Sequence, residues 1–141
     1  WLYVSGTHNP TKYRLVPKGA GDPDSIQITF DEEVEKFGTL TAIDPLEGGI
    51  KWQAKTRLPL VSGSVATKGG LVFHGQSDGM FVGRNAKTGE KLWEFNTGAG
   101  VNAPPITYAI GDSQLIAVAA GGHKLFKFPL GDAVIAFGLT D

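Results

Sequence analysis

The chain contains no cysteine and only one methionine. Disulfides, thiolate metal sites and cysteine nucleophiles are therefore excluded. Charge is also scarce: charged residues make up 19% of the chain, and 13 Lys and Arg against 14 Asp and Glu leave a net charge of -1. Such a balance gives no basic surface for phosphates, so we predict no nucleic-acid partner and no polybasic membrane anchor. The stretch 92–122 has few charges, but Glu94, Asp112, glycines and prolines interrupt it, so no transmembrane helix fits there.

Turn-forming residues are abundant instead. The 141 residues include 20 Gly and 8 Pro, and 41% of them are hydrophobic. This composition indicates a globular β domain with many tight turns, and we treat 1–141 as a single domain unit. The first residue is Trp1 rather than Met, and no signal peptide is recognisable. We therefore expect this chain to be a piece of a larger protein.

An internal repeat organises the chain. Segments 42–52 and 83–93 align without gaps at an offset of 41 residues, so that Asp44, Gly48 and Trp52 match Asn85, Gly89 and Trp93. A period of about 40–45 residues with four short strands is typical of a β-propeller blade. Asp or Asn can cap the turn, and Gly can supply its positive φ. We expect each Trp to be buried as a wedge between blades with its indole bonded to turn backbone, rather than to be an isolated core aromatic.

Short β-rich runs divide the chain into about three blades. The complete blade has runs at 65–67, 70–74, 79–85 and 91–96; the blade before it has 2–5, 39–43 and 51–54, and the blade after it has 105–108, 114–119 and 133–139. The first blade lacks its innermost strand and the last lacks its outermost strand. We therefore predict an all-β fold, a β-propeller fragment of about three blades, two of them incomplete. Propellers close with about four to eight blades, so a second polypeptide must complete the ring, and its N-terminal segment is expected to donate the missing outer strand.

Several motifs resemble one known family. The stretches 69–73, 78–81, 91–98, 103–108 and 131–137 are similar to the C-terminal quarter of quinoprotein dehydrogenases, eight-bladed propellers that use pyrroloquinoline quinone (PQQ). The resemblance implies oxidation of an alcohol, polyol or sugar hydroxyl, with electrons passed to cytochrome c or a quinone. It also implies a periplasmic location and a Ca²⁺ or lanthanide ion bound mainly by a larger N-terminal chain. The catalytic Asp and the metal ligands are expected on that chain, so no residue here is assigned to either role.

The same resemblance selects five candidate cofactor-binding residues in loops that reach the propeller axis. Val61 stands in the first outer-to-inner crossing (58–63), where methanol-oxidising members carry the tryptophan beneath PQQ. Asn102, in the second crossing (98–103), has an amide that can donate to a quinone or carboxylate oxygen, or stabilise a turn. Gly121 and Gly122 would let backbone N–H groups approach a carboxylate. His123 would add a donor or simply line a polar loop.

Other readings remain open at this point. A non-catalytic propeller scaffold for protein–protein interaction is the alternative to an enzyme, although it has no need of the glycine-rich loop before His123. His8 and His74 are interpreted as ordinary structural residues. The acidic run 31–36 lies in an insertion spanning 7–38, and it is either a solvated turn or a docking surface for a basic electron acceptor.

Overall fold

A computed structural model describes residues 1–17, 19 and 24–139. These residues form twelve β-strands and no helix, and so none that could cross a membrane. The strands are β1 (Leu2–His8), β2 (Thr11–Val16), β3 (Ser25–Phe30), β4 (Phe37–Asp44), β5 (Gly49–Thr56), β6 (Ser64–Ala66), β7 (Leu71–Gly75), β8 (Met80–Asn85), β9 (Lys91–Asn96), β10 (Ile106–Ile110), β11 (Ser113–Ala120) and β12 (Ala133–Gly138).

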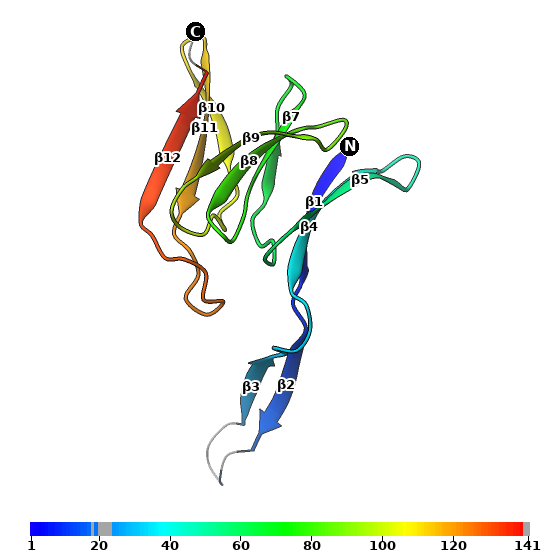
Figure 1. The fold of residues 1–141 in the computed structure, drawn as a ribbon, viewed down its shortest axis with the longest axis vertical. Coiled ribbons are helices and arrows are strands. Elements are labelled where there is room, and N and C mark those ends of the chain that lie inside the picture. Colours follow the sequence, from blue (N-terminus) through cyan, green and yellow to red (C-terminus); the bar gives the residue numbers. More distant parts are fainter. Residues whose placement is uncertain (18, 20–23, 140–141) are drawn as a thin grey trace.

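Three antiparallel sheets stand next to one another, and each is one blade of a propeller (Figure 1). Blade 1 has the order β1-β4-β5, blade 2 the order β6-β7-β8-β9, and blade 3 the order β10-β11-β12. A fourth sheet is the hairpin β2-β3. The predicted propeller fragment is confirmed. Among the described residues, blades 1 and 3 each have three strands, one fewer than blade 2, as the sequence predicted.

The repeated turn has the same structure in blades 1 and 2. The Asp44 carboxylate accepts hydrogen bonds from the backbone N–H groups of Leu46 (3.0 Å) and Glu47 (3.3 Å). Asn85 accepts two equivalent bonds from the residues two and three positions after it. Gly48 and Gly89 close the two turns with φ angles of 70° and 77°, in the left-handed region that favours glycine. The motif read from the sequence is therefore the hairpin turn between the third and fourth strands of a blade.

The two repeat tryptophans differ in their surroundings. Trp52 donates its indole N–H to the Ala86 carbonyl of blade 2, as expected for a wedge between blades. Trp93 packs edge-on against Phe81 and Phe137, at 6.0 and 5.2 Å between ring centroids, but it remains 39% exposed. An apolar cavity of about 320 Å³ opens beside it. The expectation that Trp93 is buried is thus wrong for this chain, because blade 3 has no fourth strand among the described residues to cover it.

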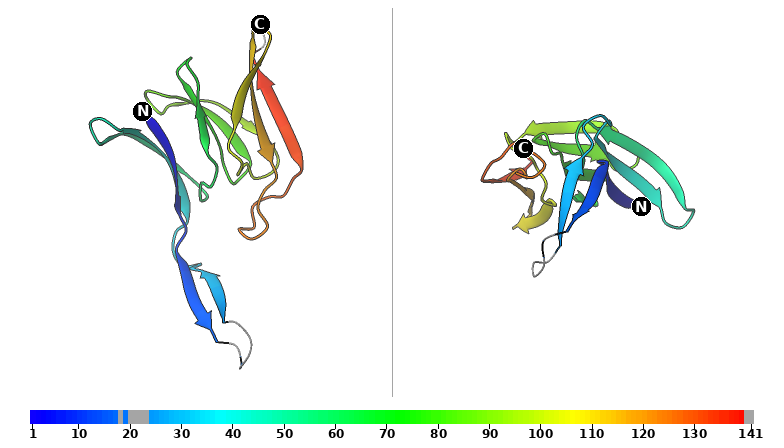
Figure 2. Two further views of the ribbon diagram at one scale, coloured as in Figure 1. Left: turned by 180° about the vertical axis from the view of Figure 1, so that it is seen from behind. Right: turned by 90° about the horizontal axis from the view of Figure 1, so that it is seen from below.

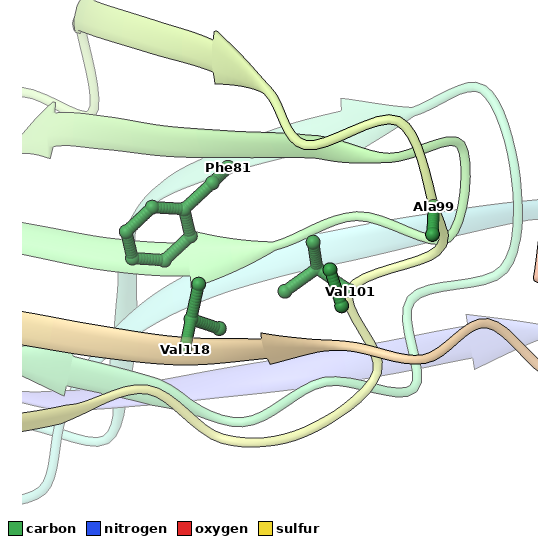
Figure 3. Packing of buried hydrophobic residues seen from close by; sticks show 5 residues of the cluster. Phe81, Ala99, Val101 and Val118 are labelled. Atoms are coloured by element: carbon green, nitrogen blue, oxygen red, sulfur yellow. The ribbon is translucent and has the colours of Figure 1, made fainter. Parts of the chain in front are cut away.

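A cluster of buried apolar residues lies between blades 2 and 3. Phe81, Val101, Val118 and Ala120 are at most 2% exposed, and Ala99 completes the cluster at 4% (Figure 3). Two of these residues come from the crossing between β9 and β10, so this loop is part of the core. It is held in place by the same apolar packing that joins the two blades.

Blades 1 and 3, at the two ends of the three-blade fragment, expose apolar faces. Phe81 is the second residue of β8 and Val134 the second residue of β12, so the two stand at matching positions of their blades. Phe81 is fully buried against blade 3, whereas Val134 is 78% exposed. At the other end, Leu2 and Val4 of β1 are 55% and 45% exposed. Contiguous apolar faces of this kind mark surfaces that pack against another protein element.

The insertion between β1 and β4 forms the β2-β3 hairpin, which projects away from the three blades (Figures 1 and 2). Its acidic run is largely neutralised by lysines. The ion pairs are Asp31–Lys12 (2.8 Å), Glu32–Lys36 (3.0 Å) and Glu35–Lys55 (2.6 Å). This pairing leaves little net negative charge for the electrostatic attraction of a basic electron acceptor.

Candidate functional site

Four of the connections between strands gather at one end of the blades. In a four-stranded antiparallel meander, the link between the second and third strands lies at the same end as the crossing from the fourth strand to the next blade. Residues 76–79 and 121–132 are such links, and residues 57–63 and 97–105 are such crossings. All five candidate site residues lie in these segments.

Two buried serines tie the crossings together. Ser77 Oγ donates to the Pro59 carbonyl of the first crossing (2.5 Å) and lies 3.2 Å from Asn102 Oδ1 of the second. Ser62 Oγ lies 3.0 Å from the Ala103 carbonyl oxygen, which it can reach as a donor. Both serines are at most 2% exposed. Because buried hydroxyls without partners are costly, these bonds fix the loops relative to one another.

The second crossing is also joined to the β11–β12 loop through backbone bonds. Gly100 donates its N–H to the Pro129 carbonyl, and Gly122 donates its N–H to the Gly100 carbonyl, both at 2.8 Å. Gly131 donates to the Gly121 carbonyl across the same loop (3.2 Å). The loop that carries Gly121, Gly122 and His123 therefore rests directly on the crossing that carries Asn102.

Val61 and Asn102 occupy equivalent positions in successive blades. They are 41 residues apart, the period of the repeat, and each follows a buried apolar residue. Those residues, Leu60 and Val101, are 1% and 0% exposed. Val61 itself is 37% exposed, so it faces away from the packed side of the crossing. The equivalence places both positions at the same end of successive blades, and contact with a cofactor stays a prediction for both.

Two side-chain atoms in this cluster are buried and unpaired. Among the described residues, neither Asn102 Nδ2 nor His123 Nδ1 has a hydrogen-bond partner. A buried polar atom left unpaired carries a penalty of about 1–3 kcal/mol, which a bound polar ligand would relieve. The two atoms therefore fit a ligand with several polar oxygens at this end of the blades.

Gly121 and Gly122 have different structural roles. Gly122 has a φ of 68°, and a Cβ there would overlap the Pro129 carbonyl oxygen, so the loop itself requires glycine. Its N–H is already bonded to Gly100 and is not free to bind a carboxylate. Around Gly121 the space is open, because the atom nearest to a Cβ would be the Gly131 carbonyl oxygen at 3.9 Å. Whether either glycine contacts a cofactor stays a prediction.

The other two histidines have structural surroundings. His74 is fully buried in β7, and its Nε2 accepts a hydrogen bond from Arg84 Nε (3.2 Å). Burial, followed by the nearby Arg84 charge, lowers the pKa of His74 to about 4. His8 stacks on Phe37 with 4.5 Å between ring centroids. In the described part of the chain, no group of three or more His, Asp or Glu residues is arranged to hold a metal ion.

Reasoning from sequence did not find the two serines. Extending the 41-residue repeat into the crossings would have shown that Ser62 matches Ala103, at positions where the two crossings touch. No comparable signal existed for Ser77, which lies in a turn that looks like any Ser-Asp-Gly turn.

Comparison with known proteins identifies relatives of this chain. The family model described as "Glucose/ethanol/alcohol dehydrogenase, beta-propeller domain", of the PQQ type, matches residues 22–116. A quinoprotein ethanol dehydrogenase of Pseudomonas putida is 51% identical over 87 residues, covering 62% of this chain and 14% of that protein. A 1-butanol dehydrogenase (quinone) of Thauera butanivorans is 37% identical over 121 residues, covering 86% of this chain and 19% of that protein.

Solved structures show the same likeness. The quinohemoprotein alcohol dehydrogenase from Comamonas testosteroni superposes with a TM-score of 0.67 and 33% identity, covering 79% of this chain and 18% of that one. A europium-containing methanol dehydrogenase gives a TM-score of 0.69 and 31% identity, with coverages of 85% and 22%. The chain thus spans less than a quarter of the length of each of these proteins.

Proposed function

Because the chain belongs to the PQQ-dependent alcohol dehydrogenase propeller family, we propose that it forms part of an enzyme that oxidises an alcohol, polyol or sugar hydroxyl to a carbonyl. The observation that carries this proposal is the loop cluster with the unpaired Asn102 Nδ2 and His123 Nδ1 at the end of the blades. These two atoms lie on loops at one end of the blades, whereas the other unpaired buried atoms, Ser5 Oγ and His74 Nδ1, lie within strands β1 and β7.

The residues of this chain would form one edge of the cofactor site. Asn102 and His123 would donate hydrogen bonds to quinone or carboxylate oxygens, Gly121 would allow close approach of the backbone, and Gly122 would hold the loop. Val61, in place of a larger aromatic residue, would leave room on the same side. PQQ, when bound, supplies the redox chemistry by accepting a hydride equivalent from the hydroxyl-bearing carbon, while the protein orients cofactor and substrate.

The remaining machinery is proposed to belong to a larger N-terminal chain that completes an eight-bladed ring. Its expected contributions are the Ca²⁺ or lanthanide ligands and the Asp that takes the substrate hydroxyl proton. Support comes from the exposed apolar end faces around Leu2 and Val134 and from the much greater length of the relatives. We further propose cytochrome c or a quinone as the electron acceptor and the periplasm as the location.

The test is a PQQ titration of the assembled propeller, followed by absorbance and by native mass spectrometry. One PQQ per assembly is expected, and Asn102→Ala should weaken binding about tenfold, the effect of losing one hydrogen bond to a charged group. Gln27→Ala is the matched control, because Gln27 is exposed in the middle of β3, three residues from Phe30, and this variant should bind PQQ as the unmodified protein does. An assembled ring that takes up no PQQ would reject the enzyme and favour the scaffold.

A further inference from the structure

The β2-β3 hairpin touches the loop that carries His123, although the two belong to blades 1 and 3. Phe30, the last residue of β3, lies 5.6 Å from Phe126 of the β11–β12 loop, measured between ring centroids. Both segments leave the blades at the same end (Figures 1 and 2). The corresponding link of blade 2, residues 76–79, is only a tight turn, so it does not extend between the hairpin and the β11–β12 loop.

Phe126 connects this contact to the candidate site. Its ring lies 4.7 Å from the His123 ring and 5.5 Å from that of Phe128. Phe128 is only 6% exposed and anchors the loop to the core side. A chain of ring contacts therefore runs from the hairpin through Phe126 to His123.

The backbone of the loop needs outside support. Lys127 has a φ of 56°, a left-handed conformation that is unfavourable for a residue other than glycine and persists where surrounding contacts impose it. The internal bonds of the turn are those of Phe128 N–H to the His123 carbonyl (3.0 Å) and Lys127 N–H to the Lys124 carbonyl (3.2 Å). Packing of the adjacent Phe126 against Phe30 supplies a further constraint from outside the loop.

Phe30 is itself fixed at the base of the hairpin. The Lys36 ammonium lies 5.9 Å from the centre of its ring. The next residue, Asp31, donates its N–H to the Pro10 carbonyl (3.1 Å) and pairs with Lys12 across the hairpin (2.8 Å). The hairpin base therefore holds the Phe30 ring in a defined place, against which Phe126 of the loop packs.

We infer that the β2-β3 hairpin positions His123 through the Phe30–Phe126 contact, which makes Phe30 and Phe126 positioning residues for the candidate site. The orientation of the His123 ring matters because its Nδ1 is buried without a partner in the described part of the chain. The inference rests on the proposed function only for what His123 binds. The positioning role of Phe30 and Phe126 rests on the ring contacts and does not depend on the proposed function.

The test is the carbethoxylation rate of each histidine in the assembled propeller, followed by peptide mass spectrometry at neutral pH. Phe30→Ala should free Phe126 and raise the His123 rate at least about threefold by local opening of the loop. Ile28→Ala is the matched control, since Ile28 lies two residues away on the same strand and is 51% exposed. It should leave the rate unchanged, and fully buried His74 should stay unmodified throughout.

An unchanged His123 rate in Phe30→Ala would overturn the positioning role. A parallel rise at His74 would also overturn it, because the whole fold would then have loosened. Added PQQ should slow modification of His123 in the unmodified protein. If the rate responds to Phe30→Ala but not to PQQ, the positioning role holds and the cofactor role of His123 is rejected.

Discussion

The indole N–H of Trp52 donates a hydrogen bond to the carbonyl oxygen of Ala86, 3.0 Å away in the next blade. The Tyr3 hydroxyl donates to the same oxygen, also at 3.0 Å. The Trp52 ring lies against Gly89, where a Cβ would come within 2.6 Å of it. The glycine of one repeat therefore packs against the tryptophan of the preceding repeat. The motif forms a contact between blades as well as a turn.

The shared acceptor predicts non-additive losses of stability. Trp52→Phe and Tyr3→Phe should each lower the free energy of unfolding of the assembled protein by about 1 kcal/mol, because Ala86 keeps one donor in each variant. The double variant leaves the carbonyl unpaired and should cost at least about 0.5 kcal/mol more than the two single losses together. Urea unfolding followed by circular dichroism measures all three. Strict additivity would mean that the two donors act independently.

His74 predicts a loss of stability in acid. Its pKa is lowered to about 4 in the folded protein by burial, against 6.5 in the unfolded chain, so the unfolded state binds the proton first as the pH falls. Above about pH 6.5 the protonation of His74 does not change the free energy of unfolding. Between pH 6.5 and 4 it lowers that free energy progressively, by roughly 3 kcal/mol at pH 4. Free energies of unfolding measured across this range should show the fall.

A matched variant isolates the His74 contribution. Val118 holds the position in blade 3 that His74 holds in blade 2, since each pairs with the third residue of the following strand. His74→Val should therefore fit and should flatten the stability curve between pH 6.5 and 4. A curve as steep as that of the unmodified protein would assign the acid sensitivity to carboxylates elsewhere.

The sequence-based prediction succeeded where the repeat carries the information. The turn and the blade order follow from the 41-residue offset, and so does the equivalence of Val61 and Asn102. Local turn chemistry and strand alternation are sufficient there because each blade repeats the same short-range pattern.

Features that depend on non-repeated contacts could not be predicted in this way. The Phe30–Phe126 contact joins an insertion to a loop 96 residues later, and the equivalent link of blade 2, residues 76–79, is only a tight turn. The exposure of Trp93 reflects the three-stranded blade 3, which has no fourth strand among the described residues. The Gly122 N–H is bonded to the Gly100 carbonyl because the β11–β12 loop packs on the crossing between β9 and β10. The two-glycine motif does not specify that packing.

The exposed end face of blade 3 predicts an assembly defect. Val134→Lys should weaken association of this chain with the rest of the propeller, expressed as a separate polypeptide, at least about tenfold, because a buried unpaired ammonium is costly. Leu46→Lys is the control: Leu46 is 95% exposed in the β4–β5 turn, and association should be unaffected. Native mass spectrometry of mixtures gives both affinities. Equal affinities would place the interface away from Val134.

The two adjacent glycines predict opposite outcomes for the same substitution. Gly122→Ala should destabilise the assembled protein by more than about 1 kcal/mol, because its φ of 68° and the overlap of a Cβ with Pro129 both oppose alanine. Gly121→Ala has room for the methyl group and should leave the thermal unfolding midpoint nearly unchanged. If the cofactor approaches the backbone at Gly121, this second variant should still bind PQQ more weakly. Unaltered PQQ affinity in Gly121→Ala would show that Gly121, like Gly122, serves the loop rather than the ligand.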